Sequence, residues 1–196
     1  MSLFKVARIL QANTILFNCD IQQGFIKHIY KSENIINTAK QMAQTANILQ
    51  LPILVTVQNV KAFGNTVPEL EKDLPKNLSQ KFEKATFSMI NEQTQAFLDQ
   101  HKERKTAILY GAEAHVCVQQ TCLDLLEKEY QVFLLTDGIT SINPIDRSTA
   151  FQRMQQAGAH LTTYQSAVFE MLKSFKHAEF KNYCQFLNQV QMNKTD

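Results

Sequence analysis

Cys117 is the residue of this 196-residue chain whose position most favours covalent chemistry. It lies six residues after Gly111, where an apolar run ends and a helical pattern begins. Backbone N–H groups and the positive end of a helix dipole stabilise a thiolate there, which makes a cysteine nucleophilic near neutral pH. The same N–H groups could stabilise an oxyanion. A small buried core residue is the alternative interpretation of this cysteine.

Asp20 directly follows another apolar run, where an unpaired carboxylate is costly to bury. It therefore needs either a partner or a function, and a lysine would supply the partner. Lys81 and Lys84 lie in the segment after the second apolar run, so we expect that segment to reach the same part of the fold. The alternative for Asp20 is a strand-end acid that is hydrogen-bonded to loop backbone.

Other reactive side chains are predicted to have structural roles. Asp137 precedes Gly138, which is a turn signal. His115 is two residues before Cys117, and residues two apart on a helix face away from each other, so no Cys–His pair is expected. The other cysteines are also expected to be structural: Cys19, Cys122 and Cys184.

Strand and helix patterns alternate along the chain and indicate how these residues are positioned. Short apolar runs without polar alternation are typical of parallel strands that are covered by helices on both faces. Helical spacing or capping signals occupy the intervening segments 35–49, 118–129 and 144–158. The strands are expected at residues 13–20, 51–58, 105–111, 131–137 and, more weakly, 159–163. This pattern predicts an α/β fold of three layers, α/β/α, with a doubly wound, mainly parallel, Rossmann-like sheet.

Ligands of such a sheet bind beyond the carboxyl ends of its strands, which is where Asp20 and Cys117 are predicted to lie. Residues 60–90 do not continue the alternation of strand and helix patterns and are predicted to form a long loop. Its part 60–83 has no pattern that indicates a substrate. One domain is expected over residues 1–196, with its core at about 13–180 and a C-terminal helical segment at 177–192.

Composition narrows the class of protein. Twenty basic and eighteen acidic residues give a formal charge of +2, so neither a nucleic-acid partner nor a strongly charged effector is expected. No apolar run reaches transmembrane length, so no membrane partner is expected. Four cysteines without a CxxC pattern favour a reduced, cytoplasmic protein. The absence of acids before Asp20 leaves mitochondrial targeting as the alternative.

Three segments in order resemble the isochorismatase-like cysteine hydrolases. Residues 16–25 (LFNCDIQQGF) resemble the D-x-Q-x-x-F opening strand of that family, and residues 84–88 (KATFS) resemble its lysine loop. Residues 111–124 (GAEAHVCVQQTCLD) are similar to the nucleophile segment G-x-x-[TAS]-x-x-C-V-x-x-T-x-x-D. The TVPEL and FSM segments are similar to the isochorismatase-domain-containing branch. The resemblance extends over about residues 14–180.

This resemblance implies a catalytic triad of Asp20, Lys84 and Cys117. In the family's mechanism the aspartate takes the thiol proton, the lysine stabilises the charges, and the thiolate attacks a carbonyl or related carbon before water hydrolyses the covalent intermediate. The resemblance also implies a cis peptide bond between Ala112 and Glu113, with an oxyanion hole made by the backbone N–H groups of Glu113 and Cys117. Family members commonly form homo-oligomers, which implies a dimer or larger assembly.

Departures from the family pattern argue against two of the family's reactions. Nicotinamidases carry a metal site around an Asp-x-His after the second strand, but this chain has Val57, Gln58 and Asn59 there, so no metal or other cofactor is expected. True isochorismatases lack the nucleophilic cysteine. The remaining expectation is metal-independent hydrolysis of a small-molecule C–N bond, of amide or carbamoyl type, through Cys117. The alternative is a catalytically silent interaction or ligand-binding protein with the same fold.

Overall fold

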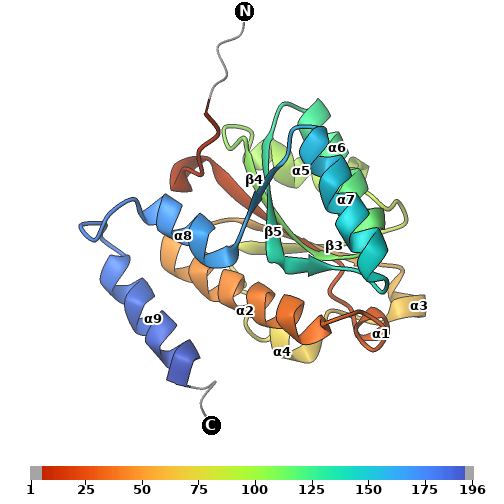
Figure 1. Cartoon of the computed structure of the whole chain (residues 1–196), viewed down its shortest axis with the longest axis horizontal. Helices are drawn as coiled ribbons and strands as arrows, with labels where there is room; N and C mark the ends of the chain where they lie inside the picture. Colours follow the sequence, from red (N-terminus) through yellow and green to blue (C-terminus); the bar gives the residue numbers. More distant parts are fainter. Residues whose placement is uncertain (1–5, 193–196) are drawn as a thin grey trace, which may run out of the picture.

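Six parallel strands form one sheet in the computed structural model, which describes residues 6–192 of the chain (Figure 1). The strands lie in the order β3-β2-β1-β4-β5-β6. Every adjacent pair is parallel. The strand bounds are β1 Thr14–Cys19, β2 Ile53–Gln58, β3 Ser79–Lys84, β4 Thr106–Ala112, β5 Gln131–Thr140 and β6 His160–Thr162.

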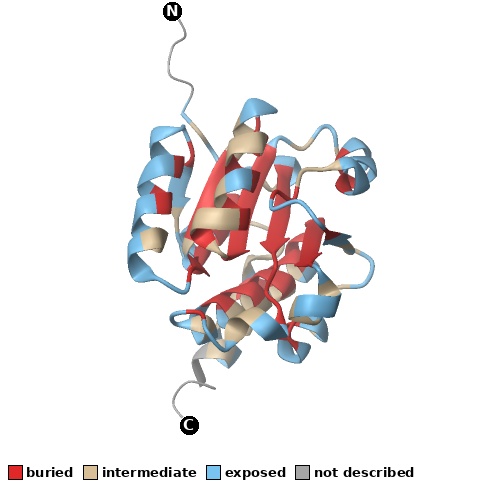
Figure 2. Ribbon diagram, turned by 90° about the vertical axis from the view of Figure 1, so that its right-hand side faces the viewer, coloured by how far each residue is buried: buried red, intermediate tan, exposed pale blue. Residues whose placement is uncertain are grey.

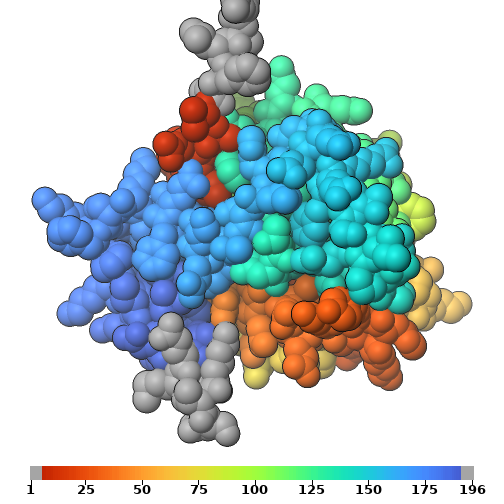
Figure 3. Space-filling view, in the orientation of Figure 1, coloured from red at the N-terminus to blue at the C-terminus, as the bar shows by residue number. Residues whose placement is uncertain are grey.

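Helices cover both faces of this sheet, so the three-layer α/β/α prediction is confirmed (Figure 1). One face carries α5 (Glu92–Gln100), α6 (Gln119–Glu127) and α7 (Pro144–Gln156), and the other carries α2 (Ser32–Leu49) and α8 (Tyr164–Leu172). Helix α9 (Phe180–Met192) lies outside that second layer and contacts α2; in the space-filling view the blue C-terminal residues lie beside the orange residues of α2 (Figure 3). The short helices are α1 Gln23–Ile26, α3 Val60–Phe63 and α4 Pro68–Glu71, and a 3₁₀ turn occupies Gln11–Asn13. Within residues 6–192, no helix combines the length and the apolar character needed to cross a membrane.

The central strands are buried along their whole length, as their uninterrupted apolar sequences predict. Every residue of β1, β2 and β4 is buried between the two helical layers, and these strands form the red centre of the molecule in Figure 2. Burial on both faces removes any need for polar alternation. The buried centre of the fold therefore carries the residues that end these strands.

The structure corrects the prediction of a continuous loop at residues 60–90. Strand β3 and the helices α3 and α4 lie within this segment. Strand β3 is an edge strand that pairs only with β2, and of its six residues only Lys84 is buried. An edge strand needs no apolar run, because one of its sides faces solvent, and charged residues there block pairing with other chains. Lys84 consequently ends a strand instead of lying in a loop.

Side chains hold the starts of α7 and α8, and the start of α7 at Pro144 is the predicted one. The Asn143 carboxamide accepts a hydrogen bond from the Ile145 N–H (3.0 Å) and caps α7, which begins at Pro144. The Asp137 carboxylate accepts from the Tyr164 N–H at 3.0 and 3.1 Å, at the start of α8. Burial raises the pKa of Asp137, while these backbone hydrogen bonds oppose the shift. Asp137 therefore has the structural role that the sequence indicates, although β5 continues to Thr140.

The strand order places a topological switch point between β1 and β4. The chain runs outward from β1 through β2 to β3, then returns to the other side of β1 and continues through β4 to β6. In doubly wound sheets the connections on the two sides of such a point diverge and leave a crevice beyond the carboxyl ends of the strands. The segments after β1 and β4 are the ones that leave the sheet at this point.

Candidate active site

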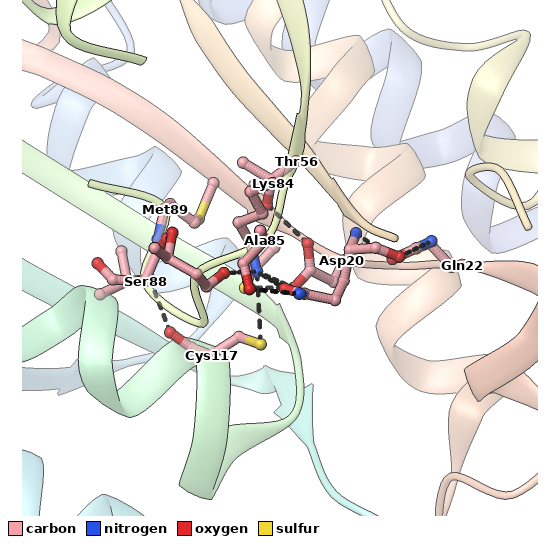
Figure 4. A network of polar contacts seen from close by, with 12 residues as sticks. Asp20, Gln22, Thr56, Lys84, Ala85, Ser88, Met89 and Cys117 are labelled. Carbon is pink, nitrogen blue, oxygen red and sulfur yellow. Dashed lines mark hydrogen bonds and ion pairs between the residues drawn. The ribbon is translucent and has the colours of Figure 1, made fainter. Parts of the chain in front are cut away.

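Asp20, Lys84 and Cys117 meet at the carboxyl ends of three strands (Figure 4). The Lys84 Nζ lies 2.7 Å from Asp20 Oδ2 and 3.5 Å from Cys117 Sγ. Asp20 follows β1, Lys84 ends β3, and Cys117 lies in the segment between β4 and α6. The side chains of Lys84 and Asp20 are 0% and 1% exposed, and Cys117 is 6% exposed. The three residues that the resemblance brought together are thus in contact through the lysine.

The Lys84 ammonium is surrounded by acceptors. Besides Asp20, it donates to Gln58 Oε1 at 2.6 Å and to the Thr86 carbonyl at 3.2 Å. These oxygens use the three N–H bonds of an ammonium, and the Cys117 sulfur adds a fourth contact. Burial lowers the pKa of Lys84, but electrostatic interactions with Cys19, Asp20 and Cys117 and the hydrogen bond to Asp20 outweigh it, so the pKa is raised. The lysine is therefore a fixed positive charge at neutral pH.

Asp20 is held by the end of β1 and by its neighbours. Its φ of +46° lies in the left-handed region, which short polar residues such as aspartate tolerate better than most, and this turn ends the strand. The Thr56 hydroxyl donates to Oδ1 at 2.8 Å, while Oδ2 receives the Lys84 ammonium. The Cys19 thiol lies 3.8 Å from the same Oδ2. Both carboxylate oxygens are therefore engaged, which fixes the orientation of the group toward the lysine.

Cys117 lies in a π-helical turn, Ala114–Val118, that leads from β4 into α6. Its carbonyl accepts from the Thr121 hydroxyl at 2.7 Å, and the same hydroxyl accepts from the Met89 N–H at 2.9 Å. Thr121 thereby ties the segment after Lys84 to the turn that carries Cys117. This contact gives a physical reason for the threonine of the nucleophile segment.

Replacing Thr121 by valine is expected to lower the free energy of unfolding by about 1–3 kcal/mol, because the buried Met89 N–H loses its acceptor. Cys117 alkylation should slow in the same variant, since the two segments of the site are no longer joined. Urea unfolding and labelling of the native protein measure the two effects. Thr121→Ser keeps the hydroxyl and is the control; a larger loss in Thr121→Ser than in Thr121→Val would show that packing of the methyl group, and not the hydrogen bonds, is responsible.

Glu113 precedes the turn and His115 lies within it, and their side chains bond to residues that follow β5. The Ala112–Glu113 peptide bond is cis, as the resemblance implied. The Glu113 carbonyl accepts from Val116 N–H (3.1 Å), and its carboxylate accepts from Ile142 N–H (2.8 Å). His115 Nδ1 lies 3.1 Å from Ser141 Oγ. The histidine is thus directed to β5 and its following loop, in agreement with the prediction of no Cys–His pair.

Gln58 ends β2 beside these residues. Across the described residues 6–192, no group of three or more His, Cys, Asp or Glu side chains is arranged to hold a metal ion. At the end of β2, Gln58 donates through Nε2 to the Ala85 carbonyl at 3.0 Å and accepts from Lys84. An amide there positions the lysine and the segment after it.

Sequence reasoning missed three residues of this site. Cys19 and Gln58 were within apolar strands and carried no motif signal, and Thr56 was one polar residue in an otherwise apolar run. Each ends or nearly ends a central strand, next to the residues that the resemblance singled out. Polar side chains at the last positions of neighbouring parallel strands were the available signal, because those positions meet at one edge of the sheet.

The fold and the site together define an isochorismatase-like α/β protein. The MAR1 ribonuclease of Caenorhabditis elegans has a similar structure, with a TM-score of 0.87, 39% sequence identity and 91% of each chain covered. The YcaC gene product of Escherichia coli, described as an octameric hydrolase of unknown specificity, has a TM-score of 0.81 over 97% of this chain and 99% of its own; at 20% identity it shows a shared fold.

The family follows from the sequence comparisons. Residues 14–166 match the isochorismatase domain. Isochorismatase family protein 1A of Dictyostelium discoideum is 42% identical over 176 residues, which cover 88% of this chain and 85% of the relative. The chain belongs to the isochorismatase family.

Proposed function

We propose that the chain is a metal-independent cysteine hydrolase that cleaves a C–N bond of a small molecule, of amide or carbamoyl type, with Cys117 as nucleophile. Membership of the isochorismatase family supports a hydrolase function. The observation that carries the finer proposal is the single buried ammonium, Lys84 Nζ, in contact with both Asp20 Oδ2 and Cys117 Sγ. A positive charge beside a cysteine stabilises the thiolate, which is the nucleophilic form.

The proposed reaction proceeds in two halves. Asp20, on the far side of the lysine, accepts the thiol proton, and the Cys117 thiolate attacks the carbonyl carbon of the substrate. The C–N bond breaks, the amine leaves with a proton, and the acyl group stays on sulfur. Water then attacks the thioester and gives a proton to Asp20, the C–S bond breaks, and the acid is released with regeneration of the thiolate.

The oxyanion of each tetrahedral intermediate needs hydrogen-bond donors that are already in place. We assign this role to the backbone N–H groups of Glu113 and Cys117. The Glu113 carbonyl accepts from both Val116 and Val118 N–H groups, so the backbone of this turn is held. The small exposed fraction of Cys117, 6%, supports a small molecule as the substrate.

Alkylation of the native protein by iodoacetamide tests the nucleophile directly. Cys117 should react at pH 7 at least about tenfold faster than an ordinary thiol, because such a thiol is only a few per cent thiolate there. Peptide mass spectrometry after labelling between about pH 6 and pH 9 gives the rate at each cysteine. Cys122 is the internal control, because burial raises its pKa to about 12. A Cys117 no faster than a free thiol at pH 7 would refute an activated nucleophile.

A screen of small amides and carbamoyl compounds then tests the reaction. Turnover should disappear in Cys117→Ala but persist in Cys122→Ala. An RNA oligonucleotide belongs in the screen, because the nematode relative is described as a ribonuclease. RNA cleavage that depends on Cys117 would contradict C–N hydrolysis. Ligand binding without turnover in both proteins would favour the silent, ligand-binding alternative.

The assembly and compartment are part of the same proposal. A homo-oligomer, a dimer or larger, is consistent with the octameric state described for the Escherichia coli protein of the same fold. A cytoplasmic site of action fits the free thiols of Cys19, Cys117, Cys122 and Cys184.

A further inference from the structure

A second thiol lies in the same cluster as Cys117. Cys19, the last residue of β1, is 0% exposed, and its Sγ lies 3.8 Å from Asp20 Oδ2. That carboxylate oxygen is 2.7 Å from Lys84 Nζ, which in turn lies 3.5 Å from Cys117 Sγ. The two thiols therefore flank one buried ion pair, one on the carboxylate side and one on the ammonium side.

The two thiols also act on each other. Burial raises the pKa of Cys19, and the hydrogen bond with the Cys117 side chain and the charge of Asp20 raise it further. Cys19 is thus a protonated thiol at neutral pH with a carboxylate beside it as an acceptor. The other two cysteines lie on helices α6 and α9, outside this cluster.

We propose that Cys19 and Cys117 form a reversible oxidation site, in which a hydroperoxide oxidises Cys117 and the neighbouring Cys19 thiol then joins it in a disulfide. The inference rests on the reactive Cys117 of the proposed function. It adds a second role for that residue and a first role for Cys19, which no step of the hydrolysis uses.

Both steps are balanced with hydrogen peroxide as the oxidant. The Cys117 thiolate attacks one peroxide oxygen, an S–O bond forms, the O–O bond breaks, and hydroxide leaves to become water. Asp20 takes the proton of Cys19, whose sulfur attacks the sulfur of Cys117; the S–S bond forms, the S–O bond breaks, and a second water leaves. Two thiols are oxidised by two electrons and the peroxide is reduced.

Disulfide formation requires the two sulfurs to move to about 2.05 Å apart. Cys117 then leaves its 3.5 Å contact with Lys84, while the Lys84–Asp20 pair can remain. The nucleophile is withdrawn from the site and protected from further oxidation to sulfinic acid, which thiols do not reverse. A reductant restores both thiols.

Peptide mass spectrometry of peroxide-treated protein tests this pairing. Trypsin releases Cys19 in the peptide 9–27 and Cys117 in the peptide 106–128, which also contains Cys122. The experiment therefore uses Cys122→Ser as the starting protein, so that any link between the two peptides can only join Cys19 to Cys117. We expect a linked peptide lighter by two hydrogen atoms than the sum of its parts, and its loss after treatment with dithiothreitol.

Cys19→Ser in the same background supplies the decisive comparison, because serine keeps a donor beside Asp20 but cannot form the bond. After peroxide and dithiothreitol, iodoacetamide labelling of Cys117 should recover in the Cys122→Ser protein and be at least about tenfold lower in the double variant, where Cys117 proceeds to sulfinic acid. Circular dichroism checks that both proteins are folded. If the protein with Cys19→Ser is not folded, the presence or absence of the linked peptide in the Cys122→Ser protein still tests whether Cys19 and Cys117 form a disulfide.

The outcomes separate this inference from the proposed function. Rapid alkylation of Cys117 at pH 7 without a linked peptide, and with equal sulfinic acid in both proteins, overturns the oxidation site and leaves the hydrolase proposal standing. A linked peptide together with slow alkylation of Cys117 supports the oxidation site and refutes the activated nucleophile.

Discussion

Replacing Lys84 by methionine is expected to lower the free energy of unfolding by about 3–5 kcal/mol, because the carboxylate of Asp20 would remain buried without its counter-charge. Cys117 alkylation at pH 7 should fall in the same variant, since the sulfur loses the ammonium 3.5 Å away. Denaturant unfolding measures the stability, and iodoacetamide labelling measures the reactivity.

Two further variants show whether the cause is the buried charge. Lys81→Met removes a lysine of the same strand that is partly exposed and paired with Glu71, so its loss should cost no more than about 1 kcal/mol. Adding Asp20→Asn to Lys84→Met removes the orphaned charge and should recover part of the lost stability, but none of the reactivity. A double variant no more stable than Lys84→Met would contradict the electrostatic explanation.

The raised pKa of Lys84 also gives the direction of a pH effect. A lysine whose pKa is higher in the folded chain than in the unfolded chain contributes stability that is complete below the unfolded value of 10.5. That contribution is lost as the pH rises through the higher, folded value. The native chain should therefore lose stability at strongly alkaline pH, and Lys84→Met should show a shallower alkaline loss.

Replacing Gly111 by alanine is expected to cost about 3 kcal/mol or more and to disrupt the site. Gly111 has φ +127°, and a Cβ atom there would lie 2.0 Å from the Cys19 carbonyl oxygen. Because Gly111 pairs with Cys19 across β1 and β4, relief of the clash requires the two strands to separate. Thermal unfolding measures the cost, and slower Cys117 labelling would report the displacement of the strand ends.

Gly158→Ala is the matched control for backbone conformation. Gly158 also has a left-handed φ, +112°, but the nearest atom to an added Cβ is Leu126 Cδ2 at 4.0 Å. This variant carries the conformational cost without the clash, about 1–3 kcal/mol, and should not affect Cys117 labelling. Equal destabilisation of the two variants would mean that strand contact at Gly111 is unimportant.

The buried parts of the fold could be predicted from the sequence, and the edge could not. β1, β2 and β4 are covered on both faces, so burial alone selects an apolar run that is visible in the sequence. β3 pairs on one side only, and its sequence SQKFEK is mostly polar because most of its side chains reach solvent. Its place in the fold depends on pairing with β2, which local sequence does not encode.

The site could also be predicted only in part from the sequence. Asp20 and Cys117 follow strands that were visible, so the rule for doubly wound sheets already placed them at one edge. Lys81 and Lys84 were both expected near this edge, and the resemblance selected Lys84. The same rule places Gln58 and Cys19 at this edge, but their contacts with Lys84 and Asp20 depend on side-chain distances across strands, which the sequence does not give. A polar residue within an apolar run shows its function only when its neighbours in space are known.

The strand order determines when, during synthesis, the cluster around Cys117 can assemble. β1 pairs through Thr14 with Thr106 of β4, so this edge of β1 stays open until the chain beyond residue 106 has been made. Long-range pairing of this kind is slow to form. A nascent chain therefore carries Cys117 as an ordinary thiol until the sheet closes around β1. On the proposed function, Cys117 would become a nucleophile only in the finished fold, which would limit its reactions with carbonyl compounds other than the substrate.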